Sequence, residues 1–205
     1  MPQHLTIYRC DARSKYRQSV QIFFGFAPWI AFMVLSSNNT FELAAVIALV
    51  IAVVVLLISR RSGSKPTAFD YATLGFFVLL VIVGLFTSDA AVATWVQPVS
   101  NFALFTIALV SILIGKPFTR EYARQSLPPE VWDSPGFLQG TLRVAWVWVA
   151  AFAVMTISSL ITVFRPNWET WTTWVIPIVA FVAAVLYTRA VEARGAARAA
   201  AARKN

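Results

Sequence analysis

The sequence predicts an all-α, polytopic membrane protein: a bundle of six transmembrane helices with both termini in the cytoplasm. Hydrophobic residues make up 59% of the chain and charged residues only 13%, whereas soluble domains average about 25% charged residues. The mean hydropathy is +0.69. Uncharged apolar runs recur along the chain, and its basic residues gather beside the ends of these runs. Together these features indicate an integral membrane protein.

The uncharged run Trp95–Gly115 sets the scale for the expected spans. At about 1.5 Å per helical residue, this run is long enough to cross a hydrocarbon core of about 30 Å. The six expected spans are Ile22–Ser36, Phe41–Ser59, Phe69–Thr87, Trp95–Gly115, Leu142–Phe164 and Trp168–Thr188. The first is the shortest and contains Gly25 and Pro28. It fits a tilted span, a span lengthened by the preceding tail, or an interfacial segment.

The distribution of basic residues predicts the orientation of these spans. With six spans, all but one of the 17 basic residues fall on one side of the membrane, and Arg165 alone falls on the other. The residues sharing a side are Arg9, Arg13, Lys15, Arg17, Arg60, Arg61, Lys65, Lys116, Arg120, Arg124, Arg143, Arg189, Arg194, Arg198, Arg203 and Lys204. Because cytoplasmic loops carry an excess of Lys and Arg, this side is expected to be cytoplasmic.

The expected domain organisation places two basic tails around the membrane domain. Residues 1–20 form a cytoplasmic tail, 21–189 the six-helix domain with a cytoplasmic segment at 116–141, and 190–205 an Ala- and Arg-rich cytoplasmic tail. Arg9, Arg13 and Arg17 share one helical face, which favours a short helix on anionic lipid. The arginines of the C-terminal tail share no face, which favours a solvated or headgroup-bound extension.

Prolines inside the spans predict kinks at Pro28, Pro98 and Pro177, because proline removes a backbone hydrogen bond. Two of them lie in a weak internal repeat, W-V-x-P-x-x-x-F, at Trp95–Phe102 and Trp174–Phe181. The repeat indicates either two parallel copies of a helical hairpin or a coincidence in an aromatic-rich chain.

Two stripes of polar side chains form the first candidate site. They are Gln97, Ser100 and Asn101 in the fourth span, and Ser158, Ser159 and Thr162 in the fifth. Helical spacing gathers each set on one face. The stripes could line a small polar cavity, as a transport or ligand site would. Alternatively, they could hydrogen-bond the two helices together. No ionisable residue lies at mid-depth, which favours the second interpretation.

The cytoplasmic segment after the fourth span holds the second candidate, a docking surface for a partner or an anionic headgroup. Phe118 and Tyr122 give an apolar edge at i, i+4, and Arg120 and Arg124 give a basic edge beside Lys116. The alternative is that this segment only seals the cytoplasmic ends of the fourth and fifth spans.

The sequence gives no indication of enzyme chemistry. Cys10 and His4 are the only residues of their types, so no cysteine or histidine cluster can bind a metal ion or act in catalysis. We expect no cofactor, no catalytic residues and no metal site. Asp70 and the other acids beside the span ends are expected to be solvated or to cap helices. No basic face carries interleaved aromatic residues, so nucleic-acid binding is not expected.

Several motifs together resemble the bacterial intracellular septation protein A family. They are the F-x-P-x-I-x-F-like opening at Phe26–Phe32, the Trp95–Pro98 entry to the fourth span, the L-x-G-K-P-x-x-R-like exit at Leu113–Arg120, the L-P-x-x-V-W segment at Leu127–Trp132 and the Trp-rich fifth span. The chain departs from the family in its basic tails and in its Arg120–Arg124 stretch, which leaves open a related family with the same core.

The resemblance implies a multi-pass protein of the bacterial inner membrane, linked to septation and envelope maintenance through other membrane proteins. It supplies no catalytic residues. The alternative function is a small transporter or channel for a neutral or lipid-like solute, suggested by the intramembrane prolines and polar stripes. The oligomeric state is not predicted.

Overall fold

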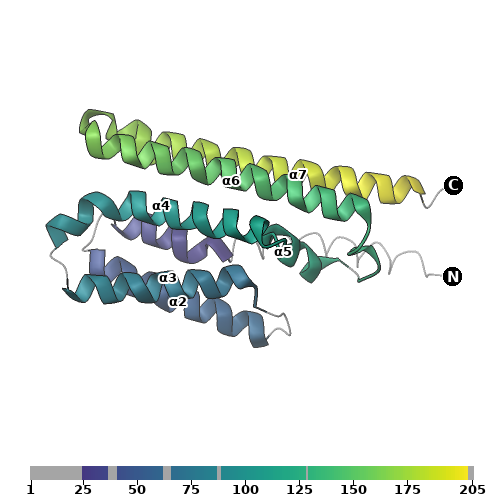
Figure 1. Ribbon diagram of the computed structural model, residues 1–205, viewed down its shortest axis with the longest axis horizontal. Coiled ribbons are helices and arrows are strands. Elements are labelled where there is room, and N and C mark those ends of the chain that lie inside the picture. The colour runs from purple at the N-terminus through teal and green to yellow at the C-terminus, as the bar shows by residue number, and fades with distance from the viewer. Residues whose placement is uncertain (1–24, 37–40, 62–65, 87–88, 128, 203–205) are drawn as a thin grey trace, which may run out of the picture. The chain divides into compact units, whose positions relative to one another are not determined.

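The computed structural model describes residues 25–36, 41–61, 66–86, 89–127 and 129–202 (Figure 1). Within these ranges every regular element is a helix and there is no strand. Five of the helical segments are long and apolar enough to cross a membrane. The first expected span is represented by a shorter apolar helix, Gly25–Ser36. The expected tail 1–20 and the end of the C-terminal tail lie outside the described residues.

Long helices and short helical turns follow the helix Gly25–Ser36 along the chain. They are α2 (Phe41–Arg61), α3 (Ala68–Phe86), α4 (Asp89–Leu113), α5 (Phe118–Ser126), η1 (Pro129–Val131), α6 (Pro135–Phe164), η2 (Pro166–Trp168), the π-helix η3 (Thr170–Val175) and α7 (Ile176–Ala202).

Three helices extend well beyond the spans expected from hydropathy. α4 begins at Asp89 rather than Trp95. α6 begins at Pro135 rather than Leu142. Ser134 caps it by accepting a hydrogen bond from the Phe137 N–H at 3.3 Å, and proline is tolerated in the first turn. α7 continues past Thr188 to Ala202, because its Ala-rich sequence has high helix propensity. Part of the expected C-terminal tail is therefore helical.

The described residues form two compact units. One comprises the residues up to Ala93 together with Glu121–Pro129, and the other comprises Thr94–Arg120 and the residues from Glu130 onward. α3 and most of α4 therefore belong to different units, although a short connection joins them. α5 also crosses the boundary, since its first turn belongs to the second unit and the remainder to the first.

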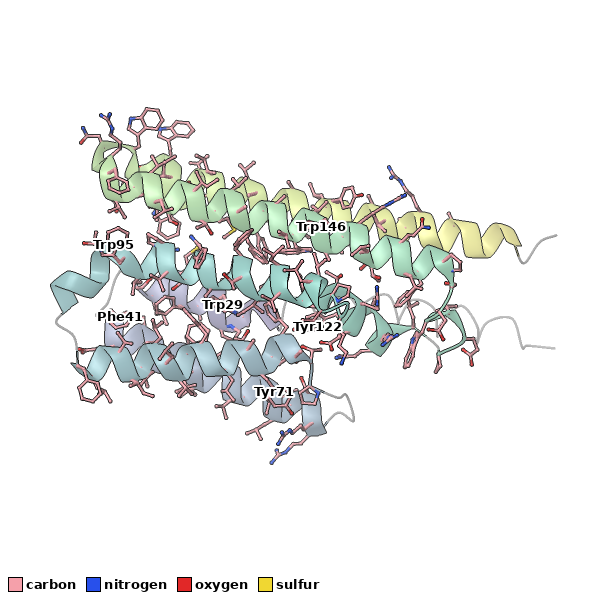
Figure 2. The ribbon with its side chains drawn as sticks, viewed as in Figure 1. Trp29, Phe41, Tyr71, Trp95, Tyr122 and Trp146 are labelled. Carbon is pink, nitrogen blue, oxygen red and sulfur yellow. The ribbon has the colours of Figure 1, made fainter. Side chains whose placement is uncertain are left out.

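An aromatic core joins the helix Gly25–Ser36 to α3 in the first unit. Trp29, labelled in Figure 2, is central to this core. Its ring stacks on Phe76 at a centroid distance of 4.8 Å, and its indole N–H donates to the Thr73 hydroxyl at 3.1 Å. Phe26 packs against Phe69 near the start of α3, and Phe32 packs against Phe77 further along both helices. The contacts advance in the same direction along both helices, so the two run parallel.

α2 and α3 pack as an antiparallel hairpin in the same unit. At one end, the ring of Phe41 lies against Gly84. At the other end, the Arg60 guanidinium donates to the Tyr71 hydroxyl at 3.1 Å. The short chain between these helices allows only this arrangement of neighbouring spans.

The second unit is built on the antiparallel pair α6 and α7. The buried indole N–H of Trp148 donates to the Thr188 hydroxyl at 3.2 Å, and its ring packs edge-to-face on Phe181. α4 lies antiparallel to α6, with Asn101 beside Met155 and the segment that follows α4 beside Thr141. The unit thus holds three of the five long apolar segments.

The three prolines expected to kink their helices occupy different backbone settings. Pro28 lies in the described helical segment Gly25–Ser36, Pro98 lies inside the continuous helix α4, and Pro177 follows the π-helical turn η3. The two W-V-x-P sequences thus have different local structures. Only the second is associated with a change of helical register.

Gly25 offers a test of the packing in the first unit. A Cβ at this position would overlap the Tyr122 hydroxyl and lie 3.0 Å from its Cζ atom, whereas nothing lies within 4 Å of a Cβ at Gly75. Gly25→Ala should lower the free energy of unfolding by about 1–3 kcal/mol. The control Gly75→Ala should raise it by about 0.5–1 kcal/mol. Unfolding in detergent micelles measures both, and equal effects would contradict this packing.

Candidate functional site

The two polar stripes both lie in the second unit, on α4 and α6, and are largely buried. Ser100, Asn101, Ser158 and Ser159 are each at most 5% exposed, and Gln97 and Thr162 are half-buried. The two stripes do not face one common site. Asn101 lies beside α6 at Met155, whereas Ser158 and Thr162 lie beside the π-helix η3.

Ser158 and Thr162 meet Thr172 on the π-helix. The Ser158 hydroxyl donates to the Thr172 carbonyl at 2.6 Å, and the Thr162 and Thr172 hydroxyls are 2.6 Å apart. The Thr172 hydroxyl lies 2.9 Å from the Trp168 carbonyl, to which it can donate. Sequence reasoning did not single out Thr172, whose only signal is a polar residue in a Trp-rich turn.

The other members of the stripes differ in what they bind. The Asn101 amide donates to the Met155 carbonyl at 3.3 Å, which links α4 to α6. The Ser159 hydroxyl donates to the Thr156 carbonyl of its own helix. The Ser100 hydroxyl is buried without a hydrogen-bond partner in the described part of the chain. These contacts favour hydrogen bonding between helices, and the polar cavity stays a prediction.

The proposed docking segment has its apolar edge buried. Phe118 is 1% exposed and Tyr122 is 5% exposed, so neither ring is available on the surface of this structure. The Phe118 N–H donates to the Ser111 hydroxyl, and the Thr119 hydroxyl donates to the Thr141 carbonyl at 2.8 Å. A docking surface at this segment would therefore depend on its cations.

The three cations of the segment are placed differently. Lys116 is exposed, and Arg120 and Arg124 are half-buried. The Arg120 guanidinium donates to the Gly115 carbonyl, directly after α4. Gly115 has a φ of 73°, a conformation that glycine adopts readily at a helix C-terminus. This glycine turn directs the chain from α4 into α5.

Asp70 is the centre of a polar cluster at the start of α3. It accepts hydrogen bonds from the Thr67 N–H at 2.8 Å and the Thr67 hydroxyl at 2.9 Å, while its own N–H donates to that hydroxyl. This reciprocal pattern caps the helix, a role expected for Asp70 from its position. The Tyr122 hydroxyl also donates to Asp70, at 2.9 Å. Glu121 accepts from the Ala68 N–H at 3.0 Å.

The cluster attaches α5 to the N-terminus of α3 through two acidic groups. Carboxylates are favourable at this end of a helix, where the first N–H groups lack partners and the helix dipole is positive. The Thr67-x-x-Asp70 spacing could have indicated the cap. The partnership with Tyr122 spans more than fifty residues of sequence and had no local signal.

Tyr122 should make stability depend on pH. Burial, and then the negative charge of Asp70, raise the pKa of the Tyr122 phenol well above its ordinary value of 10.0. Below about pH 10 both folded and unfolded chains keep the proton. Above it the unfolded chain loses the proton first, so stability falls by about 1.4 kcal/mol per pH unit.

Unfolding measured between pH 9 and 11 tests this dependence. Tyr122→Phe should remove this share of the decline, whereas the control Tyr71→Phe, at an exposed tyrosine, should leave it unchanged. The same pH profile in the wild type and both variants would contradict a buried, neutral Tyr122.

Comparison with protein families, curated proteins and solved structures found no match to this chain. The two sites are therefore interpreted from their own geometry. In the second unit, polar side chains bind backbone carbonyls; in the first, α5 is attached to a helix terminus. Both arrangements position helices, and each unit contains helices that are long and apolar enough to cross a membrane.

Proposed function

We propose that the protein is a non-enzymatic, multi-pass protein of the bacterial inner membrane that supports septation and envelope maintenance by contacting other membrane proteins. The proposal is based on the hydrogen bonds that the polar side chains of the second unit form. Ser158 and Asn101 are engaged with carbonyls of neighbouring helical segments. Because these polar groups are hydrogen-bonded inside the unit, the apolar outer faces of the helices are the surfaces through which the protein would contact other membrane proteins.

The apolar outer faces are extensive. On α2 and α7 the exposed large aliphatic residues are Leu43, Val46, Val50, Val53, Val54, Leu57, Ile58, Ile178, Val179, Val182 and Leu186. Side chains of this kind contact lipid tails or the spans of other proteins in a bilayer. The motifs that resemble the septation protein A family motivate the choice of envelope and division proteins as partners.

The direction of the first helix supports six spans. Because Phe26 lies beside Phe69 and Phe32 lies beside Phe77, the helix Gly25–Ser36 runs parallel to α3 in their unit. Two parallel helices separated by one antiparallel helix are what a six-span, N-in arrangement requires. A helix lying flat at the interface would not follow α3 in this way.

The positions of basic residues support the same orientation. In the first unit, Arg60 lies at the end of α2 beside Tyr71, while Glu42 lies at the other end. In the second unit, the contact between Thr119 and Thr141 brings the segment with Lys116 and the segment with Arg143 to one end. Anionic headgroups at the cytoplasmic face are the partners that such ends favour.

Cysteine labelling tests the orientation. In a Cys10→Ala background, Lys65→Cys and Lys116→Cys should react with a membrane-impermeant maleimide only after the cytoplasmic side is exposed. Glu169→Cys should react from the opposite side. Labelling of Lys65→Cys and Lys116→Cys from opposite sides would rule out the six-span arrangement.

Site-specific photocross-linking tests the function. A photoreactive residue at Val50 or Val179, which are 55% and 61% exposed, should capture division or envelope proteins from intact membranes. The matched control is the same variant without irradiation. Recovery of no such protein above this control at either position would contradict the proposed role.

A further inference from the structure

Pro177 leaves one backbone carbonyl of the preceding turn without a donor, and the helical register decides which carbonyl this is. In an α-helix the missing N–H would have served the residue four positions back, Thr173. In a π-helix it would have served the residue five positions back, Thr172. The two registers therefore place the unsatisfied carbonyl on different sides of the helix.

The structure has the π register. The N–H of Ile176 donates to the Trp171 carbonyl, five residues back, so it does not serve Thr172. The next residue, Pro177, has no N–H. The Thr172 carbonyl thus receives no backbone donor, and Thr172 is only 1% exposed. An unpaired carbonyl buried in this way would cost more than a hydrogen bond gains.

The Ser158 hydroxyl supplies the missing donor. It lies 2.6 Å from the Thr172 carbonyl, and the Thr162 hydroxyl is 2.6 Å from the Thr172 hydroxyl. Both groups come from α6, toward which Thr172 is turned. In the α register the Ile176 N–H would serve Thr172, and Ser158 would be redundant. The hydroxyl of Ser158 therefore stabilises the π register and not the α register.

We infer that Ser158 and Pro177 together set a register switch at the start of α7, with the Ser158–Thr172 hydrogen bond holding the π state. A π-helical turn is equivalent to one inserted residue, and each residue turns a helix by about 100°. Relative to α7, loss of the turn would rotate Trp168, which precedes it, and Trp171, which lies within it; their side chains are 61% and 62% exposed. The switch thus controls the direction of two exposed tryptophans.

A double-mutant cycle tests the linkage. Ser158→Ala should lower the unfolding midpoint by about 2–6 °C, because it leaves a buried carbonyl unpaired. In a Pro177→Ala background, the new N–H of residue 177 can serve Thr172, so Ser158→Ala should cost less than half as much. The control Ser159→Ala, whose hydroxyl bonds within α6, should cost the same in both backgrounds. An equal cost of Ser158→Ala in both backgrounds would overturn the inference.

Labelling of a buried thiol reports the register itself. In a Cys10→Ala, Thr172→Cys protein, the thiol should be protected from a small maleimide while Ser158 holds the carbonyl. Adding Ser158→Ala should speed its reaction at least tenfold, and adding Ser159→Ala should not. Fast labelling before Ser158 is replaced, or no change after it, would overturn the proposed switch.

Discussion

The fold depends on satisfying backbone carbonyls in surroundings that offer few donors. In an apolar environment an unpaired peptide group costs several kcal/mol, so helices dominate and each break in a helix needs a substitute partner. One such partner is the Ser158 hydroxyl, which donates to the Thr172 carbonyl near a proline. The Thr119 hydroxyl adds a contact between α5 and α6 by donating to the Thr141 carbonyl. A hydroxyl can also act as the acceptor: the Ser111 hydroxyl accepts a hydrogen bond from the first N–H of α5. Some polar side chains thus lie where a helix begins or changes register, and others, such as Asn101, link the interiors of two helices.

The first unit meets the same constraint at a helix terminus. The N–H groups at the start of α3 are taken by two carboxylates, one on α3 itself and one on α5. Tyr122 adds a donor to the Asp70 carboxylate and is held against Gly25. The phenol therefore bridges three segments that are distant in sequence. Elsewhere the unit relies on aromatic packing, in which the indole N–H of Trp29 is also paired.

Hydropathy predicted the long apolar helices because length and lack of charge are local properties. α2 and α3 begin and end within about two residues of the expected spans. The early starts of α4 at Asp89 and α6 at Pro135 were missed, as was the long end of α7. At α6 and α7, capping and alanine propensity extend the helix beyond the apolar run. The π-helix before Pro177 was missed for another reason. A proline in a span indicates a disturbed helix, but the register that results depends on a donor from a different helix.

The candidate sites show where sequence reasoning ends. The i, i+4 spacing of Phe118 and Tyr122 predicted an apolar edge for docking, and in the structure both side chains are buried; the docking surface stays a prediction. Ser158 and Ser159 are adjacent, identical and almost equally buried, but one binds the Thr172 carbonyl across helices and the other bonds within α6. A helical-wheel projection of α6 does not distinguish the hydrogen-bonding role of Ser158 from that of Ser159. Their roles separate only when the acceptor is known, because a hydroxyl matters most where the backbone has lost its own donor.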